Sequence, residues 1–254
     1  LKGSAQYSNY LIADNFNNSW LIDDANSGSI SSSGDNVMSF SGFNNLIGGS
    51  NDDSFVIDIL GSITGLVDGG NQYTSDVVDL SKANNANVVI ASAGGLSGFA
   101  NIEKYIGNNI DSTLTAADVV NNWSLSAANK GVLNSNIEFI NFSDLKGGNK
   151  QDNFVINNAT ISGSIDSGDG DDTFNIQASS VTGKIKAGDG NDRFTFIVVP
   201  GAEGTAIIEG GDGENRLTVE GGDTSYKATH QIGRQDYTDV NNNTYSIQYS
   251  QINN

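Results

Sequence analysis

The stretch SGDGDDTFNIQASSVTGKIKAGDGNDRFTF, residues 167–196, contains one motif twice. The first copy occupies residues 167–174 (SGDGDDTF), and the second, residues 187–194 (AGDGNDRF), begins 20 residues later. Each copy is a small residue, Gly, Asp, Gly, Asp or Asn, Asp, any residue and Phe. Because a fixed interval between copies is typical of repeat architectures, this stretch predicts equivalent units that stack on one another.

Short runs that alternate apolar and polar residues follow each motif. Phe174-Asn175-Ile176 and Phe194-Thr195-Phe196 place an apolar side chain at every second position, as a strand with one buried face does. A turn and a second short run follow, and the next Gly-Asp-Gly corner returns the chain to the following level. We therefore predict an all-β fold, a right-handed parallel β-helix (β-solenoid) with coils of about 20 residues.

A longer period relates two larger parts of the chain. Residues 18–20 match residues 121–123 at an offset of 103, and residues 43–55 match residues 142–154 at an offset of 99. Such units cannot bury their apolar faces alone, so they are expected to stack. The predicted organisation is one continuous solenoid over residues 1–254, with repeat units roughly at 17–119 and 120–220 and the start of a further repeat at 221–254.

The two ends and one irregular segment give further expectations. Residues 1–12 can be laid over residues 145–156, and residues 248–254 over residues 39–45. The chain is therefore expected to start and stop at equivalent points of a longer array. The least regular segment includes Thr115-Ala116-Ala117-Asp118-Val119, which is the best local candidate for a helix.

Composition narrows the classes of protein. The 254 residues include 31 Gly, one Pro and no Cys, and 30 Asp and Glu against 12 Lys and Arg give a net charge of −18. Short polar residues compete for backbone hydrogen bonds and disfavour helices. A strongly acidic surface argues against nucleic acid or an anionic membrane as partner, and no apolar stretch is long enough for a membrane span. This acidity suits an extracellular protein that meets divalent cations.

The motif has a chemical interpretation as well as a structural one. Gly168 and Gly170 permit backbone conformations that turn carbonyl oxygens inward, and Asp172 adds a carboxylate. Ca²⁺ takes six to eight oxygens of this kind. In a stack, Asp169, Asp189 and Asp212 would form one column and Asp172, Asp192 and Asn215 another. The candidate metal ligands are Asp169, Asp171, Asp172, Asp189, Asp192 and Asp212; the alternative is turn chemistry, with Asp and Asn bonding their own backbone.

These motifs resemble a known family. Residues 167–174, 187–194 and 210–217 (GGDGENRL) are similar to the glycine-rich, hemolysin-type nonapeptides of repeats-in-toxin proteins. The resemblance implies calcium as a cofactor, bound between stacked turns, and a secreted segment that folds on meeting calcium outside the cell. Two departures matter: only one motif occurs per coil, and the copies at residues 48–53 and 147–152 are degenerate. The longer period, with the run Gly98–Ile102, is similar to repeats of very large bacterial exoproteins and surface adhesins. This resemblance implies a protein that is secreted or lies on the bacterial cell surface.

Large apolar side chains are interpreted as core. Phe55, Phe154, Phe174, Phe194 and Leu217 recur at one position of the unit and predict a stacked column. Trp20 and Trp123 occur in equivalent segments and are expected to be core anchors rather than sugar-stacking residues.

The first functional hypothesis is non-catalytic. We expect a structural or adhesive segment of a secreted or surface-anchored repeat protein, stiffened by Ca²⁺, that contacts a matrix, a host cell or another bacterium. The alternatives are a carbohydrate-active β-helix enzyme (a lyase or an epimerase) and the calcium-binding secretion module of a toxin. An enzyme needs basic or phenolic partners beside clustered acids, but the 12 Lys and Arg are dispersed. No catalytic residue is therefore predicted.

Overall fold

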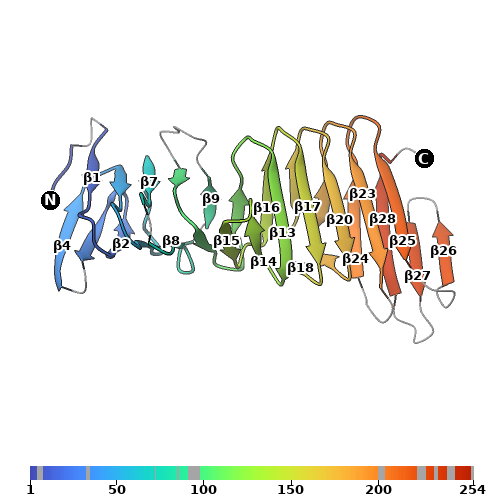
Figure 1. Cartoon of the computed structure of the whole chain (residues 1–254), viewed down its shortest axis with the longest axis horizontal. Coiled ribbons are helices and arrows are strands. Elements are labelled where there is room, and N and C mark those ends of the chain that lie inside the picture. Colours follow the sequence, from blue (N-terminus) through green and yellow to red (C-terminus); the bar gives the residue numbers. More distant parts are fainter. Residues whose placement is uncertain are drawn as a thin grey trace. The chain divides into compact units, whose positions relative to one another are not determined.

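In the part of the chain that it describes, the computed structural model consists of β-strands joined by turns and loops (Figure 1). The described residues form two compact units: unit 1 comprises residues 1–114 and 136–142, and unit 2 comprises residues 115–135 and 143–254. Within them, no residue that the structure describes is helical. The described residues are 1–4, 8–32, 35–71, 73–84, 86–90, 98–199, 204–221, 227–231, 234–238 and 244–252.

Unit 1 is built from two sets of mainly parallel strands. The first set, in spatial order, is β1 (Tyr10–Ile12), β5 (Asn45–Ile47), β7 (Leu66–Asp68) and β10 (Gly98–Ala100). The second is β4 (Asp35–Ser41), β3 (Ser27–Ser32), β2 (Asn18–Asp24), β6 (Ser54–Ile57), β8 (Val77–Asp79), β11 (Lys104–Ile106) and β15 (Ile137–Ile140). Strands β2, β3 and β4 pair antiparallel, and the other neighbours are parallel. A further strand, β9 (Asn87–Val89), neighbours β12 (Thr113–Thr115).

Unit 2 repeats this arrangement with longer strands. One set is β14 (Lys130–Leu133), β13 (Asn121–Ala127), β17 (Asp152–Asn157), β20 (Thr173–Gln177), β23 (Arg193–Val198) and β25 (Arg216–Gly221). The other is β16 (Asp144–Gly148), β19 (Ile165–Gly168), β22 (Lys184–Lys186), β24 (Gly204–Glu209), β28 (Thr244–Ser250), β27 (Arg234–Thr238) and β26 (Lys227–Gln231). The short strands β18 (Thr160–Ile161) and β21 (Ser180–Val181) pair with each other.

Strands from successive copies of the motif pair in parallel and in register. Phe154 lies opposite Phe174, Phe174 opposite Phe194, and Phe194 opposite Leu217. This pairing confirms the predicted all-β, parallel architecture, and it is consistent with a β-solenoid. As predicted, the alternation of apolar and polar residues places one face of each strand toward the interior.

Aromatic side chains stack along the interior, as predicted. In unit 2 the rings of Trp123, Phe154, Phe174 and Phe194 are stacked in that order, with centroids 5.4, 5.0 and 4.9 Å apart. In unit 1, Trp20 stacks on Phe55 at 5.4 Å. Both tryptophans are only 1% exposed, which confirms them as core residues. Each ring buries a large apolar area, so the stack holds successive coils together.

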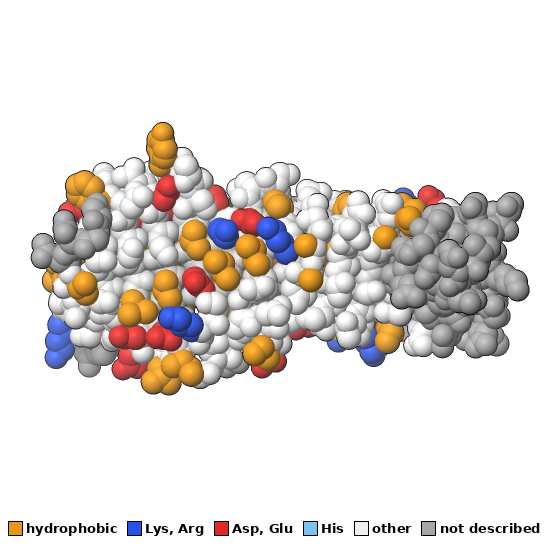
Figure 2. All heavy atoms as spheres, turned by 90° about the horizontal axis from the view of Figure 1, so that it is seen from below, with side chains coloured by type: hydrophobic (Ala, Val, Ile, Leu, Met, Phe, Trp, Pro, Cys, Tyr) orange, Lys and Arg blue, Asp and Glu red, His pale blue; other side chains and the backbone are white. Residues whose placement is uncertain are grey.

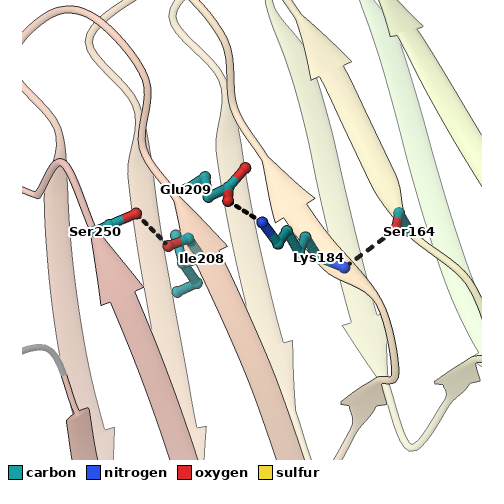
Figure 3. A network of polar contacts seen from close by, with 5 residues as sticks. All are labelled: Ser164, Lys184, Ile208, Glu209 and Ser250. Carbon is teal, nitrogen blue, oxygen red and sulfur yellow. Dashed lines mark hydrogen bonds and ion pairs between the residues drawn. The ribbon is translucent and has the colours of Figure 1, made fainter.

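Charged side chains alternate along the outer face of the β16–β28 strands in unit 2. Lys146 lies opposite Asp166, Asp166 opposite Lys186, and Lys186 opposite Glu209. Figure 3 shows this face: the Lys184 ammonium pairs with Glu209, and the Lys184 N–H donates to the Ser164 hydroxyl at 3.1 Å. At the neighbouring strand, the Ser250 hydroxyl donates to the carbonyl of Ile208 at 3.5 Å. Because like charges on opposite residues are unfavourable, this alternation favours the observed register.

The N-terminal residues pair differently from the sequence alignment. Residues 1–12 were expected to match residues 145–156, which would place Tyr10–Ile12 like Phe154–Ile156. Instead, Tyr10, Leu11 and Ile12 pair with Asn45, Leu46 and Ile47. At the other end the alignment agrees with the pairing: β28 pairs antiparallel with β27, as β4, at the residues it was aligned with, pairs antiparallel with β3. The alignment of residues 1–12 was wrong because both kinds of strand have the same apolar alternation, which does not specify the neighbour that a strand joins.

The helix candidate at Thr115–Val119 is also wrong. Thr115 ends strand β12, and the residues after it form a corner. The Asn121 side chain donates to the carbonyls of Ala117 and Val119, at 3.0 and 2.8 Å. A corner stabilised by a side-chain amide competes successfully with a helix, because these carbonyls would otherwise accept helical hydrogen bonds.

The glycine at the second position of the motif is needed where coils approach each other closely. Gly188 has a positive φ of 87°, and a Cβ there would overlap the carbonyl oxygen of Gly168. We expect Gly188→Ala to lower the free energy of unfolding by at least about 2 kcal/mol, from left-handed backbone strain and the displaced coil. Denaturant titration followed by circular dichroism measures this. Thr182→Ala, an exposed change in the same coil, should cost less than about 0.5 kcal/mol, and an equal loss in both variants would contradict the interpretation.

Candidate functional site

Buried acids and amides lie at the corners, each two residues before a Trp, Phe, Tyr, Val or Leu of the strand that follows. They form one column in each unit, and each column has one member per coil. The unit 1 column is Asn18, Asp53, Asp76 and Glu103, and the unit 2 column is Asn121, Asp152, Asp172, Asp192 and Asn215. All except Glu103 are at most 2% exposed. Buried acids require an explanation, because burial disfavours their charged form.

In the unit 2 column, each backbone N–H donates to the side chain of the next coil. The N–H of Asp152 donates to Oδ1 of Asp172 at 2.7 Å, and that of Asp172 to Oδ1 of Asp192 at 2.9 Å. The Asp192 N–H donates to Oδ1 of Asn215 at 2.9 Å. At the other end, Asn121 donates both its N–H and its side-chain amide to Oδ1 of Asp152, at 3.0 and 2.8 Å.

The unit 1 column follows the same rule. Asn18 donates its N–H and its side-chain amide to Oδ1 of Asp53, each at 2.8 Å. The Asp53 N–H donates to Oδ1 of Asp76 at 2.7 Å, and the Asp76 N–H donates to Oε2 of Glu103 at 2.8 Å. Glu103 therefore takes the place of an Asp at a shorter corner, where its longer side chain reaches the same N–H.

The local sequence explains this arrangement. At a corner the backbone turns away from the next coil, so no main-chain carbonyl is available for the N–H that starts the strand. A side-chain oxygen replaces it, which satisfies a buried donor. The first residue of the motif is small because the carboxylate lies against it: a Cβ on Gly48 or Gly147 would overlap Oδ2 of Asp53 or Asp152.

The second carboxylate oxygen has no partner in four of these acids. Oδ2 of Asp53, Asp76, Asp172 and Asp192 is buried and accepts no hydrogen bond from a described residue. The Ser167 hydroxyl lies close enough to Asp172 to favour its charged form, but it donates its hydrogen bond to the carbonyl of Ala187 at 3.0 Å. Asp152 differs, because its Oδ2 accepts the N–H of Gly148 at 2.8 Å. Gly168 and Gly188, at the equivalent corners, have φ values of 89° and 87°. A buried ionised oxygen without a donor is costly, so each of these four atoms is a place for a proton or a cation.

The pKa values follow from this environment. Burial raises the pKa of Asp53 to about 6 and that of Asp76 to about 7, and the neighbouring charges of Asp52 and Glu103 add to the increase. In unit 2, burial raises the pKa of Asp172 to about 7 and that of Asp192 to about 6. These acids consequently hold protons well above the pH at which an exposed Asp loses its proton.

The six predicted metal ligands lie in two different environments. Asp172 and Asp192 are consecutive members of the buried column. Asp169, Asp171, Asp189 and Asp212 are exposed at the corners. There, Oδ1 of Asp171 accepts the Asn191 N–H at 2.8 Å, and the backbone carbonyls of Asp189 and Asp212 accept the N–H groups of Gly170 and Gly190 at 2.8 and 2.9 Å.

These residues meet only part of what calcium requires. The two unpartnered Oδ2 atoms of Asp172 and Asp192 are suitable hard ligands, whereas several of the neighbouring oxygens already accept backbone hydrogen bonds. Over the described residues, no three His, Cys, Asp or Glu side chains are grouped as metal ligands would be. Calcium therefore stays a prediction.

Most members of the two columns were not singled out from the sequence. Asn18, Asn121, Asp76 and Glu103 occur without the Gly-Asp-Gly motif that drew attention to residues 167–194. A weaker signal was present, since Asn18, Asp53, Asn121 and Asp152 each stand five residues after an Ala or Gly and two residues before a Trp or Phe. The spacing from the aromatic residue would have found Asn18, Asn121 and Glu103, but not Asp76, because Val78 stands at that position in its coil.

Comparison with known proteins gives no family for this chain. No family model matches it, and no curated protein matches it.

The buried acids predict an unusual pH dependence. A folded-state pKa above the unfolded value of about 3.9 means that the folded state binds more protons. The stabilisation is complete below that value and is lost as the pH rises through about 6 and 7, the folded values of Asp53 and Asp76. We expect the free energy of unfolding to fall between pH 4 and pH 7. Urea titrations across this range, in EDTA, measure it.

Substitutions of Asp76 test the cause. Asp76→Asn keeps an Oδ1 acceptor for the Asp53 N–H without a charge, so it should raise stability at pH 8 and flatten the pH profile. Asp76→Ala leaves that N–H unpaired and should lower stability by about 1–3 kcal/mol at pH 8. If Asn is as destabilising as Ala at pH 8, the column needs a negative charge and the proton explanation is wrong.

Proposed function

We propose that this chain is a non-catalytic structural segment of a secreted or surface-anchored repeat protein. Its units are right-handed β-solenoids with coils of about 20 residues, which extend the protein and display outward side chains to a partner surface. The observation that carries this proposal is the pair of buried columns, because each coil completes the hydrogen bonds of the coil before it.

The position of the acids supports a structural role over a catalytic one. General acid or base catalysis requires a titratable group within hydrogen-bond reach of a substrate. The acids with raised pKa values instead lie between coils, and their backbone neighbours occupy one carboxylate oxygen each. Their contacts hold coils together, which is what a segment that bears mechanical load between two surfaces requires.

The outer surface suits display. Figure 2 shows one face on which backbone and uncharged polar side chains predominate, with acidic, basic and apolar side chains scattered over it. In the described part of the chain, no helix is long and apolar enough to cross a membrane. Since the inward positions are fixed by packing, the outward positions can vary from coil to coil without loss of the fold.

Calcium belongs to the same proposal. A divalent cation near Asp172 and Asp192 would give their unpartnered Oδ2 atoms a favourable interaction and would lower the repulsion between neighbouring carboxylates. The chain's own contribution is to hold these two oxygens on consecutive coils. The segment would then be stiffer where calcium is plentiful, as it is outside cells.

A calcium titration tests this part. Because a ligand that binds only the folded state stabilises it, millimolar Ca²⁺ should raise the melting temperature above that in EDTA. Asp192→Asn keeps the Oδ1 acceptor and removes the charge, so it should abolish most of this rise. Mg²⁺ at the same concentration controls for screening of the net charge. An identical melt in EDTA and Ca²⁺ would remove calcium from the proposal and leave the solenoid unaffected.

The non-catalytic role has its own test. We expect no shortening of acidic or neutral polysaccharides after prolonged incubation with the purified chain, measured by size-exclusion chromatography and by a reducing-end assay. A second incubation, with a hundredfold higher concentration of the chain than the first, serves to detect weak activity. New reducing ends or unsaturated products that scale with protein concentration would establish the enzyme alternative instead.

A further inference from the structure

Two arginines stand side by side on the outer face of unit 2. Arg193 starts β23, Arg216 starts β25, and the two residues are directly opposite each other in the parallel pairing. Both are exposed. They continue an outward column whose earlier members, in register, are Asn122, Asn153 and Thr173. The column thus changes from neutral to positive at its last two described coils.

The neutral members of the column bond to one another, but the arginines do not. The Asn153 amide donates to Oδ1 of Asn122 at 3.1 Å, and the Thr173 hydroxyl donates to Oδ1 of Asn153 at 2.6 Å. Neither arginine forms an ion pair or a side-chain hydrogen bond with another described residue. Like charges on opposite residues are unfavourable in a sheet. In a chain with 30 acids and 12 basic residues, an acidic partner would be easy to provide.

The arginines border a hollow. Its volume is about 1070 Å³, and Arg193 and Arg216 line it together with polar groups of Asn191, Thr195, Glu214 and Thr218. The two guanidinium groups therefore share the hollow with several hydroxyl, amide and carboxylate groups. Since the equivalent positions in earlier coils carry Asn or Thr, the fold itself does not require arginine here.

We propose that Arg193 and Arg216 bind the carboxylates of an acidic polysaccharide, one built from sugar acids, in this hollow. The proposal rests on the proposed display function and names the ligand class of the displayed surface. It assigns a role to two residues that neither the core nor the buried columns use.

The chemistry of the lining favours this class of ligand. A guanidinium presents a planar fork that can donate two hydrogen bonds to one carboxylate. The Glu214 carboxylate and the Thr218 hydroxyl offer acceptors for sugar hydroxyls, whereas Oδ1 of Asn191 already accepts the Glu214 N–H at 2.9 Å. Glu214 and the net charge of −18 oppose a ligand with densely packed negative charge, such as a nucleic acid or an anionic membrane. A chain of sugars with one carboxylate each avoids much of this repulsion.

A competing explanation concerns the strand itself. β25 is the last described strand of its set, and a charged residue on an end strand discourages pairing with another molecule. That explanation predicts no ligand and predicts self-association when the charge is removed. The same variants therefore distinguish the two explanations.

Calorimetric titration with a galacturonic acid trimer, at low ionic strength and in EDTA, tests the proposal. We expect the wild-type chain to bind this trimer and not its methyl ester, which has the same sugars without the charge. Arg193→Gln and Arg216→Gln should each weaken binding at least tenfold. Arg216→Lys, which keeps the charge but not the fork, should weaken it less. Lys146→Gln, the same change of charge on another face, should alter the dissociation constant by less than twofold.

Absence of wild-type binding, or equal binding by Arg216→Gln, would overturn the assignment. So would sedimentation that shows association of Arg216→Gln together with no trimer binding by the wild type, because the arginines would then only protect the end strand. Circular dichroism of each variant confirms that it is folded. If the wild type binds the trimer and also cleaves longer galacturonate chains, the non-catalytic proposal fails and the arginine site stands. If the wild type neither binds nor cleaves, the assignment of an acidic polysaccharide to the arginines fails and the proposed structural function stands.

Discussion

The hydrogen bond from a backbone N–H to the Asp or Asn side chain of the next coil is the interaction on which both units depend. It occurs where the chain turns a corner and the main chain cannot complete its own ladder. Two residues further on, the aromatic ring of the same coil stacks on that of the next, as Phe154 does on Phe174. One contact is directional and the other buries apolar area, and together they fix both the register and the spacing of the coils.

These hydrogen bonds place carboxylates in the interior, where an ionised carboxylate is unfavourable, and the composition of the columns limits this cost. In unit 2 the column begins and ends with a neutral amide, Asn121 and Asn215, and Asp152 has a backbone donor for its second oxygen. The remaining acids have raised pKa values, so protons or cations decide how strongly neighbouring coils repel. A stack of this kind responds to its ionic surroundings along its interior.

The outside of the stack obeys different constraints. Lys146, Asp166, Lys186 and Glu209 alternate in charge and support the register, whereas Arg193 and Arg216 repel each other and are open to a ligand. The repeated motif could be recognised from the sequence because the packing of successive coils requires it in residues 167–217, and it predicted the parallel architecture, the aromatic stack and part of one column. The arginine pair could not be found from the repeat, because a binding site that occurs once in the chain does not recur at the interval of the coils.

The sequence by itself determined the unit: a small residue and Gly at the corner, an Asp or Asn before the strand, and an aromatic residue two positions later. These choices are local, because each depends on the conformation of one corner and on one buried face. Only the tertiary structure decided which strand the N-terminal residues join, which carboxylate oxygens lack a donor, and that Arg193 and Arg216 border one hollow. Those features depend on atoms from different coils, and an apolar alternation shared by every strand carries no information about which coil lies beside it.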